Sequence, residues 1–123
     1  MNSYSDERLC GMLGMARRAG RITVGFDASA AAVATHKAKA VVVASDASEK
    51  TVKEMRFLKQ KHSSSASVLF LPMTKERLGD VLGYQKAIGV AALTDKGFAT
   101  AIEKMLAISP ANVRSDRMEE PHR

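Results

Sequence analysis

The chain has 123 residues, of which 46% are hydrophobic and 26% are charged, so it is expected to fold as a globular domain. It contains no run of 18 apolar residues and its N-terminus is too polar for a signal peptide, which predicts a cytoplasmic protein without membrane contact. One cysteine excludes an intramolecular disulfide and a multi-cysteine zinc site. The formal net charge of +6 favours a polyanionic partner, although many basic proteins bind none.

The N-terminal part of the chain predicts a helix, a short strand and a second helix. The first helix is expected to begin near residues 3–5, and its apolar residues follow the spacing of one helix face. Gly20 is expected to end this helix. Residues 22–24 predict a strand, after which Gly25 turns the chain into an alanine-rich helix.

Three more strands are expected, each followed by a helix. Residues 39–44 and 67–71 are apolar runs typical of strands covered on both faces, and residues 88–93 predict a further strand. Asp46, with Glu49 three residues later, predicts a capping box for the helix that ends near residue 62.

The last two helices carry their own start and stop signals. Thr74 is expected to cap a short helix that Gly83 ends, and Asp95 to cap the final helix. A helix followed by four strand–helix pairs predicts an α/β fold, a three-layer α/β/α sandwich. Residues 1–106 are expected to form one domain, and the polar, unpatterned residues 107–123 a disordered tail.

No group of residues predicts catalysis. The glycines at 11 and 14 lack the spacing of a phosphate-binding loop. Asp46 and Asp95 are better explained as helix caps than as catalytic acids. The histidines are scattered, so no metal site is expected. We therefore expect a protein that is not an enzyme, with neither a cofactor nor a small-molecule substrate.

A candidate binding site lies at residues 24–27, where the first strand turns into a helix whose N-terminal N–H groups suit phosphates. Basic residues that precede this turn or the next strand are candidate phosphate contacts: Arg17, Arg18, Arg21, Lys37 and Lys39. Arg17 and Arg18 equally complement the C-terminal dipole of their own helix, so the residues alone leave both roles open. The lysines within residues 50–61 are better explained as a solvated helix face.

Four stretches of the chain carry a resemblance to a known family: residues 13–25 (LGMARRAGRITVG), 37–48 (KAKAVVVASDAS), 74–83 (TKERLGDVLG) and 90–99 (VAALTDKGFA). In this order and spacing they resemble the L-seven-Ae superfamily of kink-turn-binding ribosomal proteins, and they are most similar to its small bacterial YlxQ-type members. The resemblance covers roughly residues 5–106. It implies a four-stranded mixed sheet, no catalysis and binding to structured RNA, ribosomal or other.

The resemblance also implies two contacts with RNA. Kink-turn members bind through a Gly-x-Asn-Glu-x-x-Lys pattern after the first strand, and here only its glycine is kept, as Gly25. The asparagine falls on Asp27, the glutamate on Ala28 and the lysine on Ala31. A second loop, before the helix at Thr74, packs on a flipped-out base in the family.

These contacts complete the set of candidate RNA-binding residues. The turn contributes Gly25, Phe26 and Asp27, and the second loop contributes Met73, Thr74 and Lys75. Met73 is equally explained as local core. The substitutions at Ala28 and Ala31 leave a second hypothesis open, a protein-interaction module on the same fold that has lost kink-turn recognition.

Overall fold

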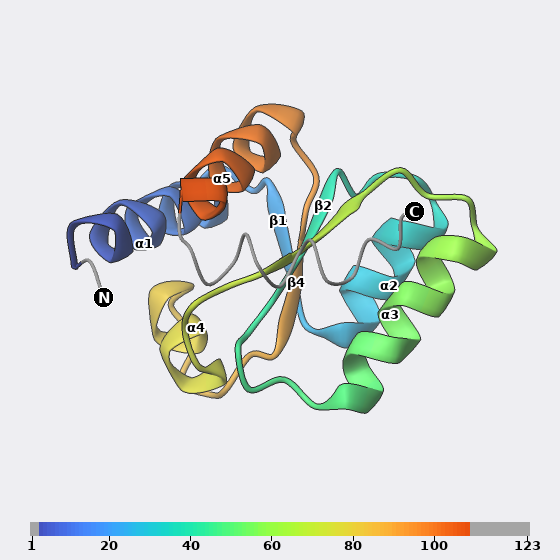
Figure 1. Cartoon of the computed structure of the whole chain (residues 1–123), viewed down its shortest axis with the longest axis horizontal. Helices are drawn as coiled ribbons and strands as arrows, with labels where there is room; N and C mark the ends of the chain where they lie inside the picture. The colour runs from blue at the N-terminus through green and yellow to red at the C-terminus, as the bar shows by residue number, and fades with distance from the viewer. Residues whose placement is uncertain (1–2, 109–123) are drawn as a thin grey trace.

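The structure, a computed structural model, describes residues 3–108 (Figure 1). Within this part of the chain, five helices and four strands follow one another as α1 (Ser3–Arg18), β1 (Ile22–Val24), α2 (Phe26–Ala34), β2 (Ala40–Val43), α3 (Glu49–Lys61), β3 (Ser67–Phe70), α4 (Lys75–Val81), β4 (Val90–Leu93) and α5 (Lys96–Ile108). This order confirms the expected alternation. α5 extends two residues past the expected domain boundary at 106, and the rest of the expected tail lies outside the described residues.

The four strands form one mixed sheet in the order β1-β4-β2-β3. β4 lies between β1 and β2 and is antiparallel to both, whereas β2 and β3 are parallel. The carboxyl ends of β1, β2 and β3 therefore meet the start of β4 at one edge of the sheet. We call this edge the carboxyl edge. The loops that leave it lead directly into α2, α3 and α4.

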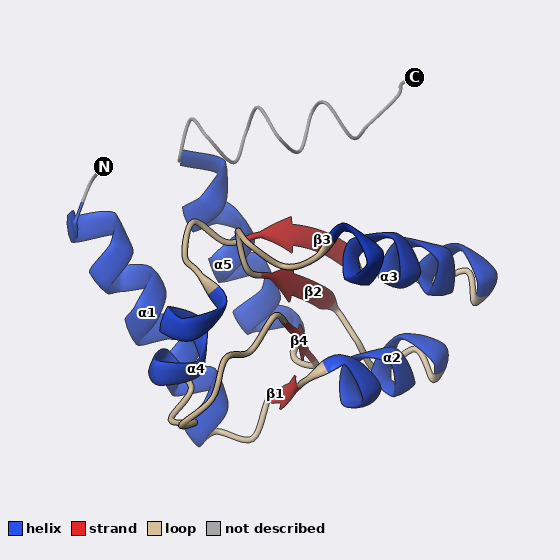
Figure 2. Cartoon of the chain, turned by 90° about the horizontal axis from the view of Figure 1, so that it is seen from below, coloured by secondary structure: helices blue, strands red, loops and turns tan. Residues whose placement is uncertain are grey.

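Helices cover both faces of the sheet, as expected for a three-layer sandwich. α1, α4 and α5 lie on one side, and α2 and α3 lie on the other (Figure 2). Side chains alternate along a strand. In β2, Val42 therefore packs with the α1, α4 and α5 core, and Val41 and Val43 pack with the α2 and α3 core. All four residues of β2 are buried, which confirms the interpretation of this apolar run.

β3 packs with both cores, as expected, but it is less buried than β2: Leu69 lies in the α1, α4 and α5 core, and Val68 and Phe70 are half-buried against the α2 and α3 core. It ends at Phe70 and lies at the edge of the sheet, and Leu69 is its one buried residue. An apolar run predicts that side chains are buried. It does not predict the order of the strands, so it cannot distinguish an edge strand from a central one. None of the helices within residues 3–108 is long and apolar enough to cross a membrane.

The capping box expected from Asp46 and Glu49 is wrong. Ser48 is the N-cap of α3, and its hydroxyl accepts a hydrogen bond from the Thr51 N–H at 3.1 Å. The Asp46 carboxylate instead accepts from the N–H of Lys75, the first residue of α4, at 2.8 Å. The loop after β2 packs beside the loop after β3. The Asp46 carboxylate, which the local spacing predicts as a cap of α3, therefore binds the first N–H of α4 instead.

The caps expected for the last two helices are confirmed. The Thr74 hydroxyl accepts from the Arg77 N–H at 3.2 Å, and the Asp95 carboxylate accepts from the Phe98 N–H at 3.0 Å. The expected helix ends are confirmed as well, because Gly20 and Gly83 both have positive φ values, 71° and 84°.

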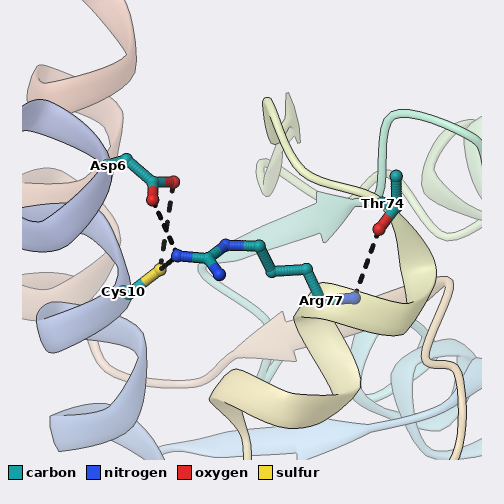
Figure 3. A network of polar contacts seen from close by, with 4 residues as sticks. All are labelled: Asp6, Cys10, Thr74 and Arg77. Atoms are coloured by element: carbon teal, nitrogen blue, oxygen red, sulfur yellow. Dashed lines mark hydrogen bonds and ion pairs between the residues drawn. The ribbon is translucent and has the colours of Figure 1, made fainter. Parts of the chain in front are cut away.

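α1 and α4 are joined by a polar contact around the single cysteine (Figure 3). The Arg77 guanidinium forms an ion pair with the Asp6 carboxylate at 2.7 Å and also lies 3.5 Å from the sulfur of Cys10. Cys10 is half-buried. Burial raises the pKa of its thiol, Asp6 raises it further, and Arg77 opposes both effects.

Candidate nucleic-acid interface

A groove of about 370 Å³ lies at the carboxyl edge of the sheet. The end of β1 and the start of α2 form one side, with Val24, Gly25 and Phe26. The start of α3 forms a second side, with Ala47, Ser48 and Thr51. Lys75, Tyr84 and residues 86–90 complete the lining. The sheet topology creates this groove, because three loops leave the same edge and a fourth returns to it.

The N-terminus of α2 opens into the groove without a side-chain cap. Gly25 is its N-cap residue and makes no side-chain cap hydrogen bond, and the first helical bond runs from the Ser29 N–H to the Gly25 carbonyl at 3.0 Å. The first N–H groups of a helix have no intrahelical acceptor. Together with the helix dipole they favour an anion. Gly25 has a φ of 98°, which L side chains rarely adopt, so this turn requires glycine.

Lys75 is fixed on the opposite side of the groove. Its N–H donates to Asp46 and its carbonyl accepts from the Ile88 N–H at 3.0 Å, so its backbone joins the loops before α3 and β4. The methylenes of its side chain pass Gly89, where a Cβ would lie 3.6 Å from the Lys75 Cδ. Lys75 is half-buried, and Thr74 beside it is exposed and serves as the cap of α4.

Among the groove residues that the sequence did not identify, Tyr84 and Lys86 carry an aromatic and a cationic side chain. Tyr84 is half-buried, and the Arg17 guanidinium lies over its ring, 5.1 Å from the centroid. Lys86 is exposed. Both belong to the loop between α4 and β4, which has no apolar period and no motif. A basic and an aromatic residue in a short loop before a predicted strand were the only signal.

The loop that carries these two residues lies directly against α4. A Cβ at Gly79 would lie 1.9 Å from the Lys86 carbonyl oxygen, closer than such atoms approach in proteins. In addition, the Tyr84 N–H donates to the Gly79 carbonyl at 2.8 Å. Glycine at position 79 therefore allows the close packing that sets the position of this side of the groove.

The structure brings some of the candidate residues together and separates others. Arg17, Gly25, Phe26 and Lys75 lie at or beside the groove, and Asp27 adds an exposed carboxylate in the first turn of α2. Arg18 is exposed and its guanidinium lies toward Gly14, where a Cβ would be 3.3 Å from its Nη1.

Arg21, Lys37 and Lys39 lie at the other end of the sheet. The Thr94 N–H donates to the Arg21 carbonyl at 2.9 Å, and the Lys39 N–H donates to the Leu93 carbonyl at 2.7 Å. All of these residues are at the amino ends of β1 and β2 or at the carboxyl end of β4. A strand of three or four residues is about 10–13 Å long, so these cations do not join the groove.

Met73 belongs to the core. It is 4% exposed and lies in the same cluster as Leu71 and Leu78. Its carbonyl accepts from the Ser45 N–H at 2.8 Å, which pairs the loops after β2 and β3. Of the two roles left open by the sequence, the structure supports local packing. Within residues 3–108, no group of three or more His, Cys, Asp or Glu side chains is arranged to hold a metal ion.

Known proteins share this sequence pattern and this fold. The profile of the ribosomal protein L7Ae/L30e/S12e/Gadd45 family matches residues 7–103. The chain is 30% identical over 106 residues to the RNA-binding protein YlxQ of Enterococcus faecium, which covers 86% of this chain and 98% of that protein.

Solved structures share the fold of this chain at lower sequence identity. A Bacillus halodurans protein of unknown function matches with a TM-score of 0.69 at 23% identity, over 79% of this chain and 94% of that one. The Giardia lamblia 15.5kD RNA binding protein matches with a TM-score of 0.66 at 17% identity, over 90% of this chain and 92% of that one. The chain thus has the fold of these proteins and belongs to the ribosomal protein L7Ae/L30e/S12e/Gadd45 family.

Proposed function

We propose that the protein is a non-enzymatic, cytoplasmic RNA-binding protein that holds structured, kink-turn-like RNA in the groove at the carboxyl edge, on the ribosome or elsewhere. The observation that carries the proposal is the uncapped N-terminus of α2 facing a groove that Lys75 and Lys86 also line. Both features favour phosphate groups. Membership of the family and the name of the Enterococcus faecium relative support RNA as the partner.

Two aromatic residues of the groove would supply contacts with bases. Phe26 and Tyr84 are half-buried and line it, and aromatic rings stack on unpaired bases of structured RNA. Direct reading of base edges would be weaker than in the family pattern, because Ala28 and Ala31 are exposed on α2 but have no hydrogen-bonding side chain. We therefore expect affinity to come mainly from phosphates and stacking.

The proposal is tested by measuring the affinity for a kink-turn RNA and for a plain duplex of equal length across a salt series. The variant pair is K75Q/K86Q, and the matched control is K37Q/K39Q at the other end of the sheet. K75Q/K86Q should weaken binding and reduce the slope of log K against log salt by up to about 2, since each lost phosphate contact removes about 1. K37Q/K39Q should leave the slope nearly unchanged.

The ratio of the two affinities shows whether the protein recognises the kink-turn itself or only the phosphates of the RNA. A preference of about 10³-fold or more for the kink-turn would establish recognition of that motif. Equal, steeply salt-dependent binding would mean that phosphate contacts alone act in the groove. Equal losses in both double variants would contradict the assignment to the groove.

A second candidate function is a protein-interaction module on the same fold. The exposed, small side chains of Ala28 and Ala31 favour it, because they replace polar residues of the RNA-reading pattern. Copurification of a protein partner after nuclease treatment, combined with no binding to either RNA, would support this function over RNA binding.

A further inference from the structure

α3 exposes a large aromatic side chain among lysines. Phe57 is 62% exposed, more than any other large hydrophobic residue in the described part of the chain. Lys50, Lys53 and Lys61 are exposed on the same helix. A single exposed phenylalanine needs no special explanation. Its position relative to these lysines is what suggests a function.

The four residues lie on one face of α3, which we call the lysine–phenylalanine face. They are three, four and four residues apart, which is the spacing of neighbours along one side of a helix. From Lys50 to Lys61 the face is roughly 16 Å long at 1.5 Å per residue. Met55, on the opposite side of the helix, is fully buried in the core beneath α2 and α3. The lysine–phenylalanine face therefore points away from the protein.

The charge of this face is not neutralised within residues 3–108. None of its three lysines forms an ion pair with a described residue. Two exposed carboxylates lie beside this face, Glu49 four residues before Lys53 and Glu54 four residues after Lys50, and the three lysines still outnumber them. The face therefore keeps a net positive charge, which attracts the phosphates of a nucleic acid.

The face is continuous with the groove. Lys50 lies within one turn of Ser48 and Thr51, which line the groove at the start of α3. Figures 1 and 2 show α3 running from the carboxyl edge along the outside of the molecule, next to α2 and away from α1 and α4. An RNA strand that leaves the groove at the start of α3 would meet Lys50, Lys53, Phe57 and Lys61 in that order.

We propose that the lysine–phenylalanine face binds a single-stranded segment of the RNA held in the groove, with a base stacked on Phe57 and phosphates near the three lysines. This inference rests on the function proposed above and adds the strand class and its path. Aromatic side chains on a basic surface are the usual device for binding single strands without sequence preference. A protein interface is disfavoured because lysines are depleted from the buried centres of such interfaces.

The test uses the absence of tryptophan from the chain. In F57W the new indole is the only tryptophan and keeps an aromatic ring for stacking. M15W is the matched control, since Met15 is 49% exposed on α1. Each protein is titrated with a kink-turn RNA that carries a single-stranded oligouridine extension on either end, and with the same RNA lacking the extension.

Stacking on Phe57 should quench the F57W emission with the extended RNA and not with the blunt one, while M15W emission stays constant. F57A should weaken binding of the extended RNA by about 5-fold or more, the effect of losing one stacked base, and leave the blunt RNA unaffected. The wild-type protein should bind the extended RNA more tightly than the blunt RNA, and K53Q/K61Q should reduce this difference in affinity.

The outcomes separate the two proposals. Binding of both RNAs with equal affinity, together with unchanged F57W emission, would overturn the role of α3 and leave the groove intact. Failure of the wild-type protein to bind either RNA would overturn the groove assignment first. Quenching of F57W by the extended RNA in a K75Q/K86Q background would show that the face binds the strand by itself.

Discussion

The Asp46 carboxylate accepts a hydrogen bond from the backbone N–H of Lys75, 29 residues further along the chain, at 2.8 Å. Asp46 precedes α3 and Lys75 begins α4, so this bond fixes the starts of two helices relative to each other. Lys75 itself lines the groove, and so does Ala47, the residue after Asp46. The contact therefore couples the stability of α4 to the geometry of the candidate RNA site.

Substitution D46A should lower the free energy of unfolding by about 1 kcal/mol, because the first N–H of α4 loses its side-chain acceptor. Urea denaturation measures this change. S45A is the control, since the adjacent Ser45 contributes its backbone N–H rather than its side chain. D46A should also weaken RNA binding through the displaced Lys75. Equal stability of D46A and S45A would contradict the capping role.

Substitutions G79A and G11A should change stability in opposite directions. A Cβ at Gly79 would collide with the Lys86 carbonyl, so the loop before β4 must move, at a cost of about 1–3 kcal/mol. Gly11 is exposed in α1, and no atom of residues 3–108 outside the backbone of its own helix lies within 4 Å of its Cβ position, so alanine there should stabilise by about 0.4–1 kcal/mol. Thermal unfolding of both variants checks the pair. A stabilising effect of G79A would show that the loop yields freely.

The contact between Arg17 and Tyr84 should be measurable in a double-mutant cycle. R17A, Y84A and the double variant should give a coupling of about 0.5–1 kcal/mol in unfolding free energy, the value of an exposed cation–π pair. Y84F keeps the ring and should keep the coupling. Additive effects, within about 0.3 kcal/mol, would mean that Arg17 is held by no interaction with this ring.

Alkylation of Cys10 should depend on pH in a way that its neighbours set. The raised pKa of the thiol, caused mainly by burial, moves the midpoint of the alkylation rate above that of the same cysteine in the denatured chain. R77Q removes the opposing effect of the guanidinium and should move the midpoint higher, whereas D6N should move it lower. Because the chain contains one cysteine, the measured alkylation rate belongs to Cys10 alone. A lower midpoint in R77Q would contradict the assignment.

The same pKa shift has a consequence for stability. The thiol ionises more easily in the unfolded chain than in the folded one, so its contribution to stability is complete below the unfolded pKa. That contribution decreases as the pH rises through the unfolded pKa towards the folded one. Replacement by serine in C10S should remove this part of the pH dependence.

The sequence by itself determined the elements and their order, because these depend on interactions a few residues apart. The apolar period of α1, the positive-φ glycines at 20 and 83, and the caps at Thr74 and Asp95 all act within one or two helix turns. The alternation of strands and helices then indicated the three-layer architecture. The resemblance to the L-seven-Ae superfamily supplied the mixed sheet.

Only the tertiary structure decided which residues share a site. β4 inserts between β1 and β2, and the carboxyl ends of three strands then meet at one edge. This order separates Arg21, Lys37 and Lys39 from the groove although they are close in sequence to its other residues. It also places Tyr84 and Lys86 in the groove, although no sequence motif or apolar period marks them.

The partners of Asp46 and Met73 also depend on the tertiary structure. A local spacing shows that a carboxylate can cap a helix and that a methionine is apolar, but not which distant backbone or core each one meets. Asp46 accepts from the first N–H of α4, whose N-cap is Thr74, instead of capping α3, and Met73 fills the core beside Leu78. Those partners depend on how the loops after β2 and β3 lie together, and that arrangement exists only once the sheet has formed.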